Sequence, residues 1–264
     1  MAPAPVAPCM TTRSNTPSES TGSAISYSLI GKSRPGSNEY MRVLLFGASG
    51  MVGQGVLREC LLDPEVESVV ALSRSPTGQR HLKLQELLHQ DFLDFSPIED
   101  QLSGFDACFF CLGVSSAGMS EQDYQRVTYG FTLAAARVLA QLNPDMTFIY
   151  VSGTGTDSTE RGRSMWARVK GKTENELLRL PFHAAYMFRP GLIVPLHGIQ
   201  SKTRLYRVFY VLLAPLLPLL ARFPKYVTTT EQIGLAMLKV SKQGWPKRVL
   251  ETADINAVGS LHLV

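Results

Sequence analysis

Apolar runs of strand length alternate with helix-like stretches from Arg42 onward. The strand-like runs are Val43–Phe46, Val69–Leu72, Ala107–Leu112 and Phe148–Val151. The helix-like stretches between them are Met51–Leu62, Glu121–Leu142 and Ser164–Leu180. Strands that alternate with helices in this way indicate βαβ crossovers and a parallel sheet covered on both faces. We therefore expect an α/β fold with a doubly wound parallel sheet.

Two predicted helices have clear boundaries in the sequence. Apolar residues recur at spacings of three and four in the stretch Gln125–Leu142, which Asn143 and Pro144 bring to an end. Thr228–Gln232 is typical of a capping box, in which a hydroxyl and a glutamine satisfy the first amides of a helix. It predicts a helix over Ile233–Ser241.

Residues 1–40 differ in composition from the rest of the chain. They hold 8 Ser, 4 Thr, 5 Pro and 3 Gly, and no apolar run long enough for the core of a signal peptide. We expect a disordered tail or a misassigned extension before Met41, which directly precedes the first strand. Because the acids there are few, an organelle transit peptide is the alternative. The folded part is then 41–264.

Composition limits the classes of function. Hydrophobic residues make up 45% of the 264 residues, and the net charge is only +4. This balance predicts a folded core and no nucleic-acid partner. The four cysteines show no pairing pattern, and a strand would turn Cys108 and Cys111 to opposite faces. We expect free thiols and a reducing, cytoplasmic location, or an organellar one if the tail is a transit peptide.

A glycine-rich turn follows the first strand and opens the first helix. The glycines Gly47, Gly50 and Gly53 form a G-x-x-G-x-x-G pattern that also contains Ser49, Met51 and Val52. The first glycine permits a tight turn, the second lets backbone approach a pyrophosphate, and the third lets the helix lie close to the sheet. The helix N-terminus attracts the phosphates. The motif predicts dinucleotide binding on a Rossmann-type fold, and a turn without a ligand is the alternative.

The end of the second strand bears on the choice of coenzyme. An acid at this place commonly holds the adenosine ribose, but here Arg74 stands between Ser73 and Ser75. A guanidinium can form two parallel hydrogen bonds to a 2′-phosphate. We therefore expect NADP(H) in preference to NAD(H), which remains possible. The alternative is an ordinary solvated arginine in a loop.

These motifs together resemble the atypical or extended branch of the short-chain dehydrogenase/reductase superfamily. The resemblance runs from about Met41 to Thr230. Within it, the chain is similar to the small oxidoreductase-like proteins grouped with the human Tat-interacting tumour-suppressor reductase. The residues that carry the similarity, besides the glycine turn, are Asp91-Phe92, Cys111-Leu112-Gly113, Val151-Ser152-Gly153, Val169-Lys170-Gly171 and Phe188-Arg189-Pro190-Gly191.

The resemblance implies a role for each position. Asp91 and Phe92 would lie by the adenine, and Cys111, Leu112 and Gly113 by the adenosine ribose. Ser152 would polarise the substrate, and Lys170 would bond the nicotinamide ribose. Pro190 and Gly191 would cover the nicotinamide. Asp91 is equally explained as a turn cap, and Ser152 as a strand-end hydroxyl.

One departure from the family limits the functional claim. Its reductases carry a Tyr-x-x-x-Lys pair on one helix, where the phenol exchanges the proton that accompanies hydride transfer. Four residues before Lys170 this chain has Trp166. An indole N–H can orient a substrate but does not titrate in water. Trp166 is equally explained by helix packing, and Tyr150 shares a strand face with Ser152 but has no assigned place at the nicotinamide.

Basic residues surround the start of this helix: Arg161, Arg163, Arg168, Lys170 and Lys172, with Glu160 and Glu174 among them. They would attract an anionic substrate or the coenzyme phosphates, or form a solvated basic surface.

The region after about residue 195 would form a small substrate-side region or lid, 195–264. The apolar run Val208–Ala221, flanked by basic residues over 202–225, is too short to span a membrane. It would line a pocket, form a homodimer contact or lie on a membrane surface.

The five histidines, His81, His89, His183, His197 and His262, show no ligand spacing, and no metal is predicted. Two interpretations of function remain. The first is an NADP(H)-dependent oxidoreductase or epimerase-like enzyme acting on a small carbonyl compound, with Ser152, Lys170 and Trp166 at its centre. The second is a dinucleotide sensor or partner-binding protein without turnover.

Overall fold

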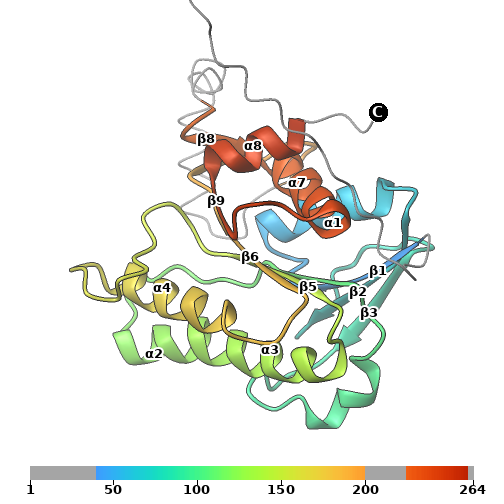
Figure 1. Cartoon of the computed structure of the whole chain (residues 1–264). Coiled ribbons are helices and arrows are strands. Elements are labelled where there is room, and N and C mark those ends of the chain that lie inside the picture. Colours follow the sequence, from blue (N-terminus) through green and yellow to red (C-terminus); the bar gives the residue numbers. More distant parts are fainter. Residues whose placement is uncertain (1–39, 200–223, 261–264) are drawn as a thin grey trace, which may run out of the picture. The chain divides into compact units, whose positions relative to one another are not determined.

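The computed structural model describes residues 40–199 and 224–260 (Figure 1). Its strands are β1 (Met41–Phe46), β2 (Val66–Ser73), β3 (Leu84–Leu88), β4 (Ala107–Phe110), β5 (Thr147–Val151), β6 (Ala184–Arg189), β7 (Leu192–Val194), β8 (Val227–Thr229) and β9 (Val249–Glu251). Its helices are α1 (Met51–Leu62), α2 (Glu121–Gln125), α3 (Phe131–Leu142), α4 (Met165–Leu177), α7 (Thr230–Gln243) and α8 (Thr252–Ser260). A 3₁₀ helix, η1 (Ser96–Gln101), and a π-helical segment, η2 (Arg126–Gly130), complete the described elements.

Seven of these strands form one parallel sheet in the order β3-β2-β1-β4-β5-β6-β9. The strand order reverses between β1 and β4, and the carboxyl ends of strands around such a switch point are where open α/β sheets bind ligands. The remaining strands, β7 and β8, pair in parallel as a small second sheet. The predicted Rossmann-type doubly wound fold is confirmed.

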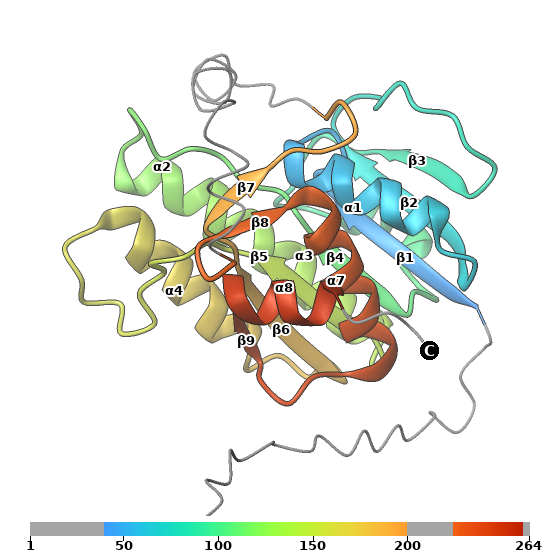
Figure 2. The ribbon, with the colours of Figure 1, turned by 90° about the horizontal axis from the view of Figure 1, so that it is seen from above.

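Helices cover both faces of the main sheet (Figures 1 and 2). Strand residues alternate between the two cores, so that Val43 and Leu45 pack with α1, α7 and α8, whereas Leu44 and Phe46 pack with α3 and α4. Because both faces are buried, the central strands contain continuous apolar runs without polar alternation. The same alternation places Cys108 in one core and Cys111 against the other, as predicted.

Most predicted elements occur within a few residues of their expected bounds, and two differ. Strand β4 ends at Phe110, so Cys111 and Leu112 belong to the turn after it. The predicted helix Glu121–Leu142 is interrupted by the π-helical segment η2. The Thr229 side chain caps α7 by accepting a hydrogen bond from the Gln232 amide over 3.0 Å, as the capping box predicted.

The C-terminal elements are part of the layered fold. Helix α7 packs against α1, and β9 adds to β6 as the last strand of the main sheet. The boundary of a substrate-side region at about 195 therefore stays a prediction. The basic and apolar residues between 200 and 223 lie outside the described residues, as do 1–39. None of the helices that the structure describes has the length and apolar character needed to cross a membrane.

Candidate functional site

The β1–α1 turn is packed closely against neighbouring backbone. Gly47 has a φ of +78°, in the region that side chains disfavour, and a Cβ there would lie 2.7 Å from the Cys111 backbone. A Cβ on Gly53 would lie 2.0 Å from the Gly47 carbonyl oxygen. Gly50 is the N-cap residue of α1 (Met51–Leu62) and provides no side-chain cap. The first amides of α1, including those of Met51 and Val52, lack partners within the helix.

The turn after β4 lies beside this glycine turn. The Cys111 amide donates to the Phe46 carbonyl over 3.0 Å, which joins the carboxyl ends of β4 and β1. The Leu112 amide lies next to Gly47. A Cβ on Gly113 would have no atom within 4 Å, so this glycine faces open space. The structure thus brings the two predicted backbone segments together at the switch point.

Arg74 is exposed at the end of β2. No ion pair within the described residues holds its guanidinium, and its carbonyl accepts a hydrogen bond from Gln90. Ser73 is buried, and its hydroxyl donates to the Ser75 carbonyl over 2.7 Å. The Arg74 side chain is therefore available to a ligand, while the Ser73 hydroxyl is used within the turn.

Asp91 and Phe92 occupy the turn after β3. An Asp91 carboxylate oxygen accepts the Leu93 amide over 2.9 Å, which is the turn-cap role considered from the sequence. The Phe92 side chain is buried in the core against Phe46 and Phe131. Phe92 therefore presents only its backbone toward the carboxyl edge of the sheet.

Ser152 follows β5 and is buried next to an ion pair. Its hydroxyl donates to a Glu174 carboxylate oxygen over 2.5 Å and lies 3.2 Å from the Phe188 carbonyl oxygen. The Arg189 guanidinium binds both oxygens of Glu174, with Nε at 3.0 and 3.2 Å. The Glu174 side chain is 1% exposed. In this arrangement the Ser152 proton is directed into the protein.

The Lys170 side chain extends from α4 to the backbone of Ser152. Its ammonium donates to the Ser152 carbonyl oxygen. Burial lowers the pKa of Lys170 to about 8, although the nearby Glu174 carboxylate acts in the opposite direction. The charged and neutral forms of this amine are therefore both accessible near neutral pH. Ser152 and Lys170 lie together, as the resemblance implied.

Trp166 lies on the first turn of α4, beside the loop that leaves β5. A Cβ on Gly155 would be 3.5 Å from the Trp166 ring. The indole is partly buried and cannot serve as a titrating acid. Tyr150 is 1% exposed and packs against Phe110 in the core, and burial raises the pKa of its phenol. A core position excludes Tyr150 as a replacement proton donor.

Pro190 and Gly191 follow β6 and lie against the neighbouring strand ends. The Thr154 amide donates to the Pro190 carbonyl over 3.0 Å. The Gly191 amide donates to the Thr252 hydroxyl over 2.8 Å, which connects this loop to the start of α8. The loop therefore belongs to the same carboxyl edge as the glycine turn and Ser152.

Some of the basic side chains at the start of α4 are paired within the protein, and others are exposed. The Arg168 guanidinium pairs with Glu121 at 2.8 Å and also bonds the Gly162 carbonyl. Arg161 and Arg163 are exposed. Glu174, placed with this surface cluster in the sequence interpretation, is instead buried with Arg189. That part of the interpretation is wrong, because α4 turns Glu174 toward the sheet.

Sequence reasoning did not assign a function to Glu174 or Arg189. A signal was available, since Glu174 follows Lys170 by four residues and therefore shares its helix face. The partner Arg189 could be recognised only once β5 and β6 were paired. The Arg189 guanidinium also binds Ser158 over 2.6 Å and Glu251 over 3.3 Å, joining the β5–α4 loop to β9.

Known proteins match the chain both in sequence and in structure. Residues 43–161 match the model of the NAD dependent epimerase/dehydratase family. The Rattus norvegicus "Protein HTATIP2" is 28% identical over 159 residues, 58% of this chain and 62% of that protein. The Debaryomyces hansenii "Protein FMP52, mitochondrial" is 25% identical over 156 residues, 58% of this chain and 67% of that protein.

The two sequence alignments thus leave 33% and 38% of the relatives' lengths uncovered. Solved structures show the same fold at low identity. The Bordetella bronchiseptica enzyme WbmF in complex with NAD+ has a TM-score of 0.61 and 14% identity, covering 84% of this chain and 78% of that chain. DesIV (dTDP-glucose 4,6-dehydratase) from Streptomyces venezuelae, with NAD and TYD bound, has a TM-score of 0.62 and 16% identity, covering 80% and 75%. The short-chain dehydrogenase/reductase resemblance is confirmed.

Proposed function

We propose that this chain binds NADP(H) along the carboxyl edge of its main sheet and uses it to reduce or oxidise a small carbonyl compound. The observation that carries the proposal is the β1–α1 turn. Its glycines leave no side chain between the uncapped start of α1 and a ligand. Unpaired amides and the helix dipole attract the pyrophosphate at this position. Gly113, which faces open space, leaves room for the adenosine ribose.

The preference for the phosphorylated coenzyme rests on Arg74. Its guanidinium is exposed and has no ion pair among the described residues, so it can bind a 2′-phosphate with two parallel hydrogen bonds. The NAD dependent family match and the NAD-bound structural neighbours make NAD(H) the competing coenzyme.

Lys170 is the proton-transfer group in this proposal. A bound nicotinamide supplies the hydride chemistry. The ammonium of Lys170 donates a proton to the developing alkoxide, and solvent returns the proton. A pKa of about 8 suits this role, because the amine is mostly protonated at pH 7 and gives up its proton easily. Trp166 borders the same loop and orients the substrate.

A second candidate, a dinucleotide sensor without turnover, is favoured by one specific observation. The Ser152 hydroxyl donates to Glu174 and the Lys170 ammonium to the Ser152 carbonyl. Both groups are thus satisfied inside the protein. To polarise a substrate, Ser152 would have to break its bond to a buried carboxylate.

Binding and turnover experiments separate the two candidates. The full chain is titrated with NADPH and with NADH by fluorescence, and carbonyl compounds are then screened for coenzyme oxidation. We expect tighter binding of NADPH, and Arg74→Ala to weaken NADPH binding about tenfold to a hundredfold without changing NADH binding. An equal loss of affinity for NADPH and NADH would contradict the role of Arg74.

Turnover that disappears in Lys170→Met while NADPH still binds would support the oxidoreductase. Tight binding with no turnover against any carbonyl would favour the sensor. If neither coenzyme binds, both candidates are wrong.

We further propose that the protein is mitochondrial. A serine-rich segment with few acids precedes the fold, and two FMP52 relatives are named as mitochondrial. These observations support a mitochondrial transit role for residues 1–40 over the cytoplasmic alternative. A C-terminal fluorescent fusion of the full chain should enter mitochondria, and one that begins at Met41 should remain in the cytoplasm.

A further inference from the structure

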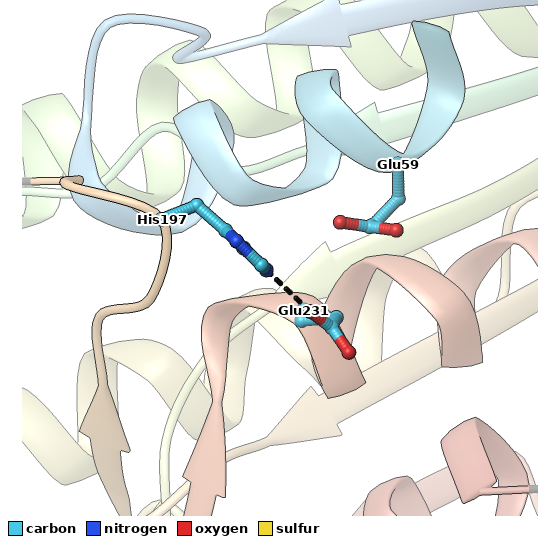
Figure 3. A group of neighbouring side chains, drawn as sticks. All are labelled: Glu59, His197 and Glu231. Atoms are coloured by element: carbon cyan, nitrogen blue, oxygen red, sulfur yellow. Dashed lines mark hydrogen bonds and ion pairs between the residues drawn. The ribbon is translucent and has the colours of Figure 1, made fainter. Parts of the chain in front are cut away.

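Three metal-ligating side chains that are far apart in the sequence meet beside α1 and α7. Glu59 comes from α1, His197 from the turn after β7, and Glu231 from the first turn of α7 (Figure 3). One donor atom from each residue lies within 4.8 Å of the other two. The two gaps in the sequence, 138 and 34 residues, explain why ligand spacing gave no indication of this group.

The scaffold around this Glu59–His197–Glu231 cluster is closely packed. A Cβ on Gly234 of α7 would lie 2.7 Å from Cγ of Glu59, so the side chain of Glu59 lies directly on the α7 backbone. The turn that carries His197 is attached to α7, because the Leu196 amide donates to the Thr230 hydroxyl over 3.1 Å. The positions of the three ligands are therefore set by the fold.

The charges of the cluster favour a cation. Glu59 is only 6% exposed, and Arg58 binds one of its carboxylate oxygens, Oε1, at 2.5 Å. His197 Nε2 lies 2.5 Å from a Glu231 carboxylate oxygen. Arg58 offsets the charge of Glu59 through Oε1 alone, and the two carboxylates and the imidazole that converge here are groups that bind divalent ions.

We propose that Glu59, His197 and Glu231 bind one divalent transition-metal ion, with Zn²⁺ the best match. One imidazole nitrogen and two carboxylate oxygens are a ligand set that zinc accepts, with water completing a tetrahedron. Calcium binds six to eight oxygens, and magnesium keeps an octahedron of oxygens, so both suit this set less well.

The site is separate from the proposed coenzyme site and has a structural role. Glu59 lies nine residues along α1 from Gly50, which corresponds to about 13 Å of helix. A metal ion here would join α1, α7 and the turn after β7, and would thereby stabilise the packing of the C-terminal elements on the sheet. The inference does not depend on coenzyme binding.

The test uses the full chain after removal of metals with a chelator. Zn²⁺ is titrated by calorimetry, and Co²⁺ serves as a spectroscopic probe of the ligands. We expect one equivalent per chain, and visible Co²⁺ bands of a tetrahedral nitrogen and oxygen site. The thiolate-to-cobalt band in the near ultraviolet should be absent, because cysteines are not among the ligands. A strong thiolate band, or no binding of either ion, would overturn the proposal.

Two variants distinguish this site from metal binding elsewhere on the surface. His197 has a φ of +56°, and asparagine tolerates that conformation, so His197→Asn removes the imidazole without straining the turn. His183→Asn is the matched control, since His183 is exposed and outside the cluster. We expect His197→Asn and Glu231→Gln each to weaken Zn²⁺ binding at least tenfold, and the control to bind as the wild type does.

Thermal unfolding provides a second measurement that does not rely on activity. Zn²⁺ should raise the unfolding midpoint of the wild type and of His183→Asn, and leave that of His197→Asn unchanged, because a ligand stabilises only the state that binds it. Equal shifts in all three proteins would show that the ion binds at another place, and the assignment would be wrong. Circular dichroism of each variant establishes that it is folded.

Discussion

Glu174 carries a negative charge at a position that water scarcely reaches. The Arg189 guanidinium pairs with this charge, and the Ser152 hydroxyl donates a hydrogen bond to it. The Arg189 side chain is itself only 12% exposed. Breaking a buried pair by removing one partner leaves the other charge uncompensated, which is far more costly than losing a surface pair. The pair therefore fixes the relative positions of β6, α4 and the end of β5.

We predict that Glu174→Gln lowers the free energy of unfolding by about 3 kcal/mol. Glu176→Gln on the same helix is the matched control, because Glu176 pairs with Arg179 at the surface, and its loss should cost at most about 1 kcal/mol. Urea unfolding of both variants measures the difference. Similar decreases in the free energy of unfolding of the two variants would mean that the buried pair stabilises the protein no more than the surface pair does.

The pKa of Lys170 leads to a prediction about the pH dependence of carbonyl reduction. Its pKa of about 8 means that the ammonium is present below this pH and is lost above it. If the ammonium donates the proton, carbonyl reduction should be constant below about pH 7 and fall about tenfold per unit well above pH 8. The steady-state rate of NADPH oxidation across this range tests the assignment.

Lys170→Arg offers a control for the pH profile. Arginine keeps the positive charge but does not release a proton in this range, so coenzyme binding should survive while turnover is lost. A wild-type rate that does not change between about pH 7 and 9 would exclude Lys170 as the donor.

At the level of elements, the segments that follow β1 and β4 contain two kinds of glycine, one that the fold needs and one that a ligand needs. A Cβ on Gly53 would lie 2.0 Å from backbone, whereas a Cβ on Gly113 would meet no atom within 4 Å. We predict that Gly53→Ala destabilises the protein by on the order of 1–3 kcal/mol. Gly113→Ala should leave the free energy of unfolding within about 0.5 kcal/mol of wild type.

Coenzyme titration completes this comparison. Gly113→Ala should bind NADPH more weakly than the wild type, because its methyl group would enter the space proposed for the ribose. Unchanged NADPH affinity in this stable variant would show that the coenzyme does not pass Gly113.

The elements were largely predictable from the sequence because each carries a local signal. Helix α1 begins after the glycine turn and ends before Asp63-Pro64, and its predicted and observed bounds are the same. The interruption of the long helix by η2 has no comparable local signal. Strand β9 is three residues long and depends on pairing with β6, so a pattern search has little chance of finding it.

The candidate site was predictable only where its residues are adjacent in the chain. The glycine turn could be recognised as a motif, and its geometry follows from backbone sterics. The Glu174–Arg189 pair and the Glu59–His197–Glu231 cluster each join residues from different elements. Such groups appear only after the strands have been ordered and the helices packed on them.

For the molecule as a whole, the C-terminal elements should be essential to stability. Helix α7 contributes the fully buried side chains of Ile233 and Met237 to the core beside α1, and β9 contributes Leu250. We predict that a chain ending at residue 226 does not fold, since it would expose the apolar surface of α1. Circular dichroism and NADPH binding test this. A truncated chain that is soluble, cooperative in unfolding and able to bind the coenzyme would contradict the prediction.

The position of β9 at the edge of the sheet also affects biosynthesis. The ribosome synthesises Val249–Glu251 well after Met187–Arg189, with which they pair. During that interval the backbone of β6 presents free hydrogen-bonding groups to other nascent chains. The sheet therefore cannot be completed until β9 has been synthesised, and a chaperone that shields this border during synthesis should increase the yield of native protein.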